Sequence, residues 1–228
     1  MKDLQERYLD ARIVKSCYSC GSPNPTTRDH VPPKAFLDKP FPFLATVPSC
    51  EACNCNFSLD EEYVACAIEV AACGSADPTN FERARISRAV IRNARLRRQL
   101  EQEFGPAPQL GINPDWGKFS RVFEKVARGL LLYETSIHAL DLDVQLKFIP
   151  IDDVDAPWRR AVASEPDFLL PEIGSRQFHR WIEDQNDFTV VQPDRFEFSC
   201  ASLPDHYRIR MLIGNVLLVD AHLRDRAT

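Results

Sequence analysis

The sequence contains no long apolar run. None of its stretches approaches the roughly 18 consecutive apolar residues that a membrane-spanning helix needs. The first residues, MKDLQERYLDAR, are charged throughout and lack the apolar segment of a secretory signal peptide. Internal repeats and low-complexity segments are missing as well. We therefore expect a cytoplasmic protein that has no membrane as a partner.

An overall excess of basic residues is also missing. The chain carries 28 Lys and Arg against 33 Asp and Glu, a net charge of −5, which by itself does not indicate a nucleic-acid-binding protein. The charge is unevenly distributed, however. Residues 81–128 carry 11 basic against 5 acidic side chains, whereas residues 141–200 carry 6 against 13. Because a polyanion responds to local potential, the basic middle segment is the candidate surface for one.

The residue pattern predicts an α+β fold. Hydrophobic residues make up 44% of the chain, so a core of useful size can form without metals or disulfides holding the whole chain together. We expect a cysteine-rich unit at 1–75, a helical region at 76–140, and a mixed α/β accessory region with antiparallel strands at 141–228. Apolar periodicity predicts helices at 1–15, 59–73, 80–104, 116–140 and near 174–184. β-rich composition, with a turn at Gly214-Asn215, predicts strands within 144–149, 187–191, 195–201 and 206–221.

Two helix starts carry recognisable capping patterns. Ser58 and Glu61 have the spacing of a capping box, and so do Thr79 and Glu82. Glu61 and its neighbour Glu62 are expected at a helix N-terminus, where acidic side chains are favoured by the helix dipole. We therefore interpret both glutamates as helix-capping residues.

Four of the eight cysteines have the spacing of metal ligands. In a secreted chain an even number would suggest disulfides, but in a cytosolic chain Cys-x-x-Cys pairs indicate metal. Cys17 with Cys20 and Cys50 with Cys53 would fill the four tetrahedral positions of one zinc ion, leaving none for catalysis, so a structural zinc is expected. The alternative is two unrelated pairs of buried cysteines. The others lack this spacing: two are expected in the core and two have no assigned role, namely Cys66 and Cys73, and Cys55 and Cys200.

Asp29 and His30 lie between the two cysteine pairs, and Asn54 directly follows Cys53, the last cysteine of the second pair. Adjacent side chains on a strand point to opposite faces, so one of Asp29 and His30 could bind a metal while the other faces solvent or a substrate. Carboxylate and amide oxygens suit Mg²⁺ or a similar hard ion. An imidazole with an ordinary pKa suits general base catalysis at neutral pH. The alternatives are a structural His30 and an Asn54 that only caps a helix.

This order of residues resembles a known family. Cys-x2-Cys, then Asp-His, then Cys-x2-Cys-Asn is similar to the zinc-stapled HNH (His-Me finger, ββα-metal) endonucleases, and in particular to their endonuclease VII-like H-N-N variant. The resemblance covers residues 17–62. It implies a strand near 26–31, a second strand near 43–48 and a helix that starts near Cys50. On this basis residues 1–75 would form an HNH-like zinc-stapled ββα nuclease unit.

The resemblance also implies roles for individual residues. His30 would be the general base that accepts a proton from the attacking water. Asp29 and Asn54 would hold one catalytic Mg²⁺ or Mn²⁺ ion against the scissile phosphate, and the four cysteines would hold zinc. The chain departs from the family at one position, because Ala45 lies near the place of the second-strand asparagine that orients the histidine. Asn24, Asn56 or a backbone carbonyl would have to replace it.

Basic side chains follow one face of the helix expected at 80–104. The four arginines at intervals of 3, 4 and 3 residues are Arg85, Arg88, Arg92 and Arg95, and three more broaden the face, namely Arg83, Arg97 and Arg98. We expect the four, together with Lys34, to contact phosphates of a nucleic acid. The alternatives are a solvated Lys34 and an arginine face that pairs with the acidic segment 141–200.

These observations predict a metal-dependent endonuclease that hydrolyses phosphodiester bonds, with DNA as its expected substrate. The helices and C-terminal strands would serve substrate choice, regulation or self-association, which includes a possible homodimer. The alternative hypothesis is a non-catalytic zinc-finger module that binds nucleic acid or protein, with Asp29-His30 as a remnant. The missing second-strand asparagine is the strongest argument for that alternative.

Overall fold

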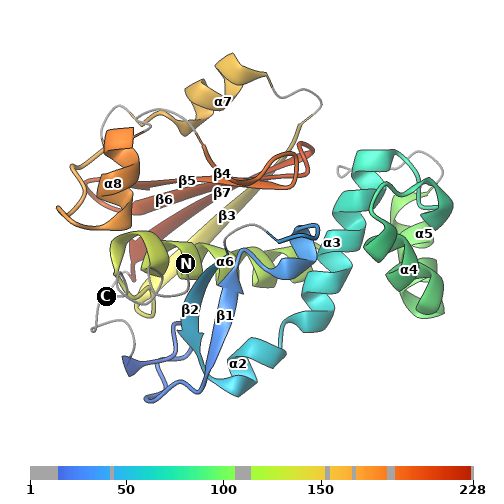
Figure 1. Cartoon of the computed structure of the whole chain (residues 1–228), viewed down its shortest axis with the longest axis horizontal. Helices are drawn as coiled ribbons and strands as arrows, with labels where there is room; N and C mark the ends of the chain where they lie inside the picture. Colours follow the sequence, from blue (N-terminus) through green and yellow to red (C-terminus); the bar gives the residue numbers. More distant parts are fainter. Residues whose placement is uncertain are drawn as a thin grey trace.

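The structure is a computed structural model of the chain that describes residues 15–41, 44–105, 114–151, 155–165, 168–183 and 188–226. The helix expected at 1–15 lies, except for its last residue, outside this part. The described chain is an α+β fold, as expected (Figure 1). In chain order its elements are β1 (Thr27–Val31), η2 (Lys34–Phe36), β2 (Ala45–Ser49), α2 (Glu51–Cys55), α3 (Ser58–Cys73), η3 (Pro78–Asn80), α4 (Ala84–Arg92), α5 (Ala94–Phe104), α6 (Trp116–Thr135), β3 (Leu142–Pro150), α7 (Ala156–Ala163), α8 (Arg176–Glu183), β4 (Thr189–Gln192), β5 (Phe196–Ser202), β6 (Tyr207–Ile213) and β7 (Leu217–Asp225).

The C-terminal strands form a five-stranded antiparallel sheet in the order β3-β7-β6-β5-β4. This confirms the antiparallel sheet predicted from composition. Gly214 and Asn215 connect β6 to β7, and both have positive φ, 58° and 55°. Positive φ at both central residues is the geometry of the tight hairpin turn that Asn and Gly favour. Helix α7 was not predicted, whereas α8 lies where the short helix near 174–184 was expected.

Helix α6 lies between the large sheet and the β1-β2 hairpin, and it contacts strands of both (Figure 1). Five side chains of its apolar face are fully buried, as their spacing predicted: Phe119, Val122, Phe123, Val126 and Leu130. Gly129 allows the close approach to β1, because a Cβ atom there would lie 2.7 Å from Val31 Cγ2. The expected end at residue 140 is wrong, since the helix ends at Thr135 and Ser136 takes the left-handed conformation (φ 63°).

The first strands form an antiparallel hairpin that is followed by a helix. Its register pairs Asp29 with Val47 and His30 with Thr46. Helix α2 begins directly after β2, and the Cys50 side chain caps it by accepting a hydrogen bond from the Cys53 N–H. Helix α3 then packs against α6. This order places Asp29, His30 and the start of α2 on neighbouring elements.

The single helix predicted at 80–104 is two helices. Asn93 has non-helical backbone angles (φ −113°, ψ 87°), which end α4, and its side chain caps α5 by accepting from the Leu96 N–H. Both predicted capping boxes are also wrong. Asp77 rather than Thr79 caps the short η3 helix, and the Ser58 hydroxyl donates to the Cys55 carbonyl.

The main hydrophobic core joins all three predicted parts of the chain. It contains Tyr18 and Val31 from the first part, Phe119 from the second, and Val219 and Phe196 from the third. The division at residues 75 and 140 stays a prediction. None of the helices in the described part of the chain combines the length and the apolar character needed to cross a lipid bilayer.

Candidate metal centre and adjoining cleft

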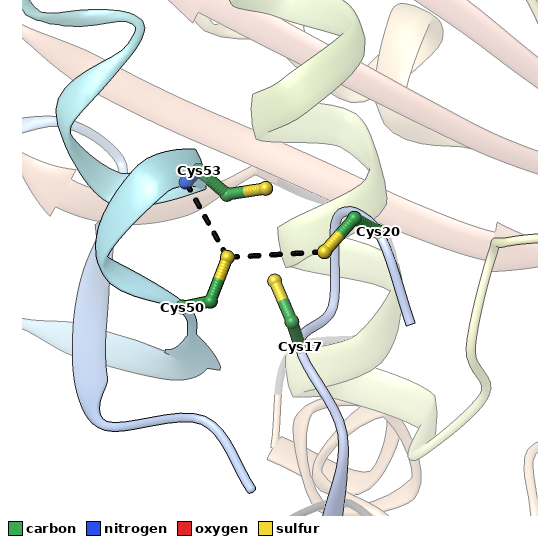
Figure 2. Close-up of side chains that lie close together, drawn as sticks. All are labelled: Cys17, Cys20, Cys50 and Cys53. Atoms are coloured by element: carbon green, nitrogen blue, oxygen red, sulfur yellow. Dashed lines mark hydrogen bonds between the residues drawn. The ribbon is translucent and has the colours of Figure 1, made fainter. Parts of the chain in front are cut away.

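The side chains of Cys17, Cys20, Cys50 and Cys53 converge on one point, with all four sulfur atoms within 4.8 Å of one another (Figure 2). Cys17 and Cys20 come from the turn before β1, and the other pair from the start of α2. The Sγ atoms of Cys20 and Cys50 lie 3.8 Å apart. Tetrahedral Zn–S bonds of about 2.3 Å give nearly this separation between ligand atoms. The cluster therefore has the ligand chemistry and the spacing to hold a metal ion such as zinc.

Two of these thiols have shifted acidity. Hydrogen bonding to Ser22 lowers the pKa of Cys20 to about 6, which favours the thiolate that binds metal. Burial raises the pKa of Cys53 to about 12, so this thiol stays protonated at neutral pH unless a cation compensates its charge. A bound metal ion would deprotonate both thiols, because its charge stabilises the thiolate form.

A cleft of about 460 Å³ lies beside the cluster, between β1, the start of α3 and α4. It brings together most of the residues that the sequence placed in the site: Asp29, His30, Lys34, Asn54 and Arg85. Two glutamates that the sequence interpreted only as capping residues, Glu61 and Glu62, also line it. The cleft therefore combines an imidazole, carboxylates, an amide and two cationic side chains.

Asp29 is held by two donors on one of its oxygens. Its Oδ2 atom accepts a hydrogen bond from the Tyr18 hydroxyl at 2.8 Å and lies 2.8 Å from the Lys125 ammonium. Burial raises the pKa of Tyr18 well above its ordinary value, with Asp29 adding to the shift, so the phenol stays a donor. The other oxygen, Oδ1, has no side-chain partner within the described ranges. Asp29 thus keeps one carboxylate oxygen for a ligand.

The amide of Asn54 is oriented by its neighbours. Its Nδ2 atom donates to Thr27 Oγ1 at 3.2 Å and to the Arg28 carbonyl at 3.4 Å. Thr27 already donates its own proton to the Ser49 carbonyl, so it can only accept from Asn54. Both partners therefore hold the amide nitrogen of Asn54 against β1, and its carbonyl oxygen is left for a hard cation.

His30 is half-buried at the end of β1. Burial lowers the pKa of His30 below its ordinary value, with Lys34 adding to the effect and Asp29 opposing it, so the ring is neutral at pH 7. No side chain in the described segments bonds to the ring. Ala45 pairs with Val31 rather than with His30. Neither Asn24 nor Asn56, both of them described, replaces the missing second-strand asparagine.

Two arginines of the predicted basic surface line hollows on the protein. Arg85 lines the cleft, and its Nη1 donates to the Lys34 carbonyl at 2.9 Å. Arg85 and Arg88 also line a second hollow of about 640 Å³, together with Lys34 and Lys39. Basic side chains thus extend from the cleft along the first turns of α4.

The other two arginines of the predicted surface, Arg92 and Arg95, are exposed and lie on opposite sides of the Asn93 break, on α4 and α5. Among the ion pairs formed within the described ranges, none joins any of the four arginines to the acidic segment 141–200. Arg83 behaves differently, because it is buried and pairs with Asp38 at 2.9 Å. The interpretation of Arg83 as a surface residue is therefore wrong, whereas the other four guanidinium groups stay available.

Sequence reasoning missed Lys125 and the role of Glu61. The Lys125 ammonium lies 2.5 Å from Glu61 Oε1 and is almost fully buried. The Glu61 side chain binds this ammonium rather than the helix N-terminus. The sequence signal that could have identified Lys125 is its position directly before Val126, a residue of the apolar face of α6. Its partners on β1 and α3 are too distant in sequence for periodicity to identify.

Comparisons of the chain with models of protein families, with curated proteins and with solved structures yield no match. The chemical interpretation of the cleft therefore depends on its own geometry.

Proposed function

We propose that this protein is a metal-dependent endonuclease that hydrolyses phosphodiester bonds in DNA, with an N-terminal ββα-metal finger as its catalytic unit. One observation carries the proposal. The cleft holds a neutral His30, a free oxygen of Asp29 and the free carbonyl oxygen of Asn54. A β-hairpin followed by a helix, with a four-cysteine cluster at its base, supports the same assignment.

Zinc in the four-cysteine cluster would be structural. Four thiolates complete the tetrahedral shell of zinc and leave no position for water or substrate. The cluster links the turn before β1 to the start of α2, so it fixes the two elements that carry Asp29, His30 and Asn54. Its contribution to activity is therefore to hold these side chains in place.

The residues of the cleft divide the catalytic work. His30 accepts the proton of the attacking water, which its neutral ring can do at pH 7. Asp29 and Asn54 would hold a divalent ion such as Mg²⁺ or Mn²⁺ through their oxygen atoms, and such an ion would supply stabilisation of the negative charge that develops on the phosphate and the leaving group. Lys34, Arg85 and Arg88 bind neighbouring phosphates of the strand.

Plasmid cleavage tests the proposal. The full-length protein should nick supercoiled plasmid with Mg²⁺ or Mn²⁺ and not with EDTA. His30→Ala should reduce the rate by roughly 10²–10⁴-fold, the usual loss on removing a general base. His179→Ala is the matched control, because His179 is an exposed histidine on α8 outside the cleft. Equal rates for His30→Ala and the wild type would assign the cleavage to another site or to a contaminant.

The non-catalytic binding module is the second candidate. The observation in its favour is that no described side chain orients the His30 ring. A protein that binds DNA but cleaves no duplex, branched or single-stranded DNA or RNA, with any divalent ion, would support this alternative.

A further inference from the structure

A buried lysine links two carboxylates at the back of the cleft. Lys125 on α6 lies 2.8 Å from Asp29 Oδ2 on β1 and 2.5 Å from Glu61 Oε1 on α3. Its side chain is only 3% exposed. The Phe57 ring also lies against the ammonium, at 4.9 Å from the ring centroid. Three elements from distant parts of the sequence thus meet at one ammonium group.

The charges in this cluster do not balance. Burying an ammonium group is costly unless it is paired, and one carboxylate would satisfy that requirement. Here there are two carboxylates, so the ionised cluster carries one excess negative charge. A divalent cation in the cleft would offset the remaining charge.

The position of Lys125 leaves one oxygen of each carboxylate free. Lys125 binds Oδ2 of Asp29 and Oε1 of Glu61, and neither Oδ1 nor Oε2 has a side-chain partner in the described part of the chain. Both residues line the same cleft as Asn54. The donor set then consists of two carboxylate oxygens and an amide oxygen, with water completing the shell that Mg²⁺ or Mn²⁺ prefers.

We propose that Glu61 is a further ligand of the divalent cation and that Lys125 is the positioning residue that holds Glu61 and Asp29 side by side. This inference rests on the proposed function, since it concerns the same cleft. Lys125 then has a role in cation binding in addition to the stabilising role of a buried ion pair. The Lys125 ammonium lies between two like charges and binds one oxygen of each, so that each carboxylate keeps a second oxygen for a ligand.

The test measures Mn²⁺ binding to the zinc-loaded, full-length protein without DNA, and electron paramagnetic resonance monitors the binding. Glu61→Gln keeps a hydrogen-bond acceptor for Lys125 but removes the charge, and it should weaken Mn²⁺ binding at least about tenfold. Lys125→Met should weaken it by about 10–100-fold, the usual cost of removing a group that orients a metal ligand. Lys125→Arg, which retains the charge, should recover part of the affinity.

Two substitutions on the same helices provide matched controls. Asp60→Asn removes a neighbouring carboxylate that pairs with Arg121 outside the cleft, and Lys118→Met removes another lysine of α6, which contacts Tyr63. Both should bind Mn²⁺ like the wild type. Thermal unfolding of every variant identifies affinity losses that merely follow from misfolding, and Glu61→Gln keeps the test valid if Lys125→Met does not fold.

The outcomes separate this inference from the proposed function. If the wild type cleaves DNA while folded Glu61→Gln and Lys125→Met bind Mn²⁺ with unchanged affinity, the inference is overturned and the nuclease stands. If Mn²⁺ binding to the wild type depends on Glu61 and Lys125 but the protein cleaves no nucleic acid, the cation site is supported and the nuclease proposal fails.

Discussion

Asp38 and Arg83 form a 2.9 Å ion pair that joins the loop after β1 to the residue that precedes α4. The Arg83 side chain is buried and also donates to the carbonyls of Ala35 and Leu37. Arg195, before β5, lies 2.6 Å from the other Asp38 oxygen. Asp38 thus links the hairpin unit, the arginine-bearing helix and the C-terminal sheet.

Asp38→Asn should destabilise the protein in a pH-dependent way. At pH 7 we expect a loss of about 1–3 kcal/mol in the free energy of unfolding, because Arg83 keeps its charge in a buried site. Burial raises the pKa of Asp38, but hydrogen bonds from Arg83 and Arg195 outweigh it, and the net pKa lies below the ordinary value. Such a group stabilises the fold above its unfolded pKa, and this stabilisation disappears as the pH falls through the folded pKa.

Urea unfolding of the wild type and of Asp38→Asn at pH 7 and near pH 3 measures this effect. The difference between the two proteins should shrink at the lower pH. Asp143→Asn is the control, because Asp143 is exposed and its pair with Arg226 is exposed as well. If the difference in the free energy of unfolding between the two proteins is the same at both pH values, the charge of the Asp38 carboxylate is not its cause.

Gly129→Ala should destabilise the packing of α6 against β1. Alanine usually stabilises a helix relative to glycine by about 0.5–1 kcal/mol, but a Cβ atom here would lie 2.7 Å from Val31 Cγ2. Overpacking of this kind costs about 1–3 kcal/mol, so we expect a net decrease in stability. Gly117→Ala in the first turn of α6 is the control, since the nearest neighbour of its Cβ atom would be the Asp115 side chain at 3.2 Å. Equal melting temperatures for both variants would contradict the close approach of α6 to β1.

Local signals predicted the elements whose structure depends on local sequence. The strands of the C-terminal sheet and the Gly214-Asn215 turn follow from β-rich composition and turn chemistry, and the buried face of α6 follows from its spacing. The convergence of the four cysteines follows from their paired spacing. Within each strand, turn, helix face and cysteine pair, the residues that carry the signal are neighbours along the chain.

The features that the sequence did not reveal depend on distant partners. Arg83 and Arg85 are both arginines on a basic stretch, yet only Arg83 is buried, because Asp38 and Glu69 reach it. The Asn93 break is an exception with a local cause, because the Asn93 side chain caps α5, but the arginine spacing continues on both sides and hides it. The role of Lys125 was hidden because its partners lie on other elements. Periodicity identifies a helix face but not the charged groups that lie opposite it.

The four-cysteine cluster should contain about one zinc ion per chain, which elemental analysis of the purified protein measures. Cys17→Ser and Cys53→Ser should release the metal and expose the β1-β2 hairpin to proteases, because metal binding contributes to folding there. Cys55→Ser is the control, as Cys55 is exposed and lies outside the cluster. A metal-free protein with a protease-resistant hairpin would contradict the zinc assignment.

Charge reversal on α4 should weaken DNA binding without regard to sequence. Arg85→Glu and Arg88→Glu should lower the affinity and reduce the salt slope, by about one unit for each phosphate that is no longer neutralised. Arg95→Glu should have less effect, because Arg95 lies beyond the Asn93 break and lines neither hollow. Arg226→Glu is the control, since Arg226 directly follows β7 and also lines neither hollow. Equal salt slopes for all these variants in filter binding would exclude α4 as the DNA-binding surface.

The two substitutions of Asp29 should separate its role in metal binding from its role in stability. Asp29→Asn keeps an oxygen for Tyr18 and Lys125 but removes the charge, so cleavage should require a higher Mg²⁺ concentration while the fold changes little. Asp29→Ala also removes the acceptor of the buried Tyr18 hydroxyl and one of the two carboxylate partners of Lys125, and it should additionally lower the free energy of unfolding by about 1–3 kcal/mol. Asn54→Ala should raise the metal requirement less, because a neutral carbonyl offers the cation less charge than a carboxylate does. Cleavage rates titrated with Mg²⁺, together with urea unfolding, measure both effects. If Asp29→Asn cleaves with the metal dependence of the wild type, Asp29 is a structural partner of Lys125 and not a ligand of the catalytic ion.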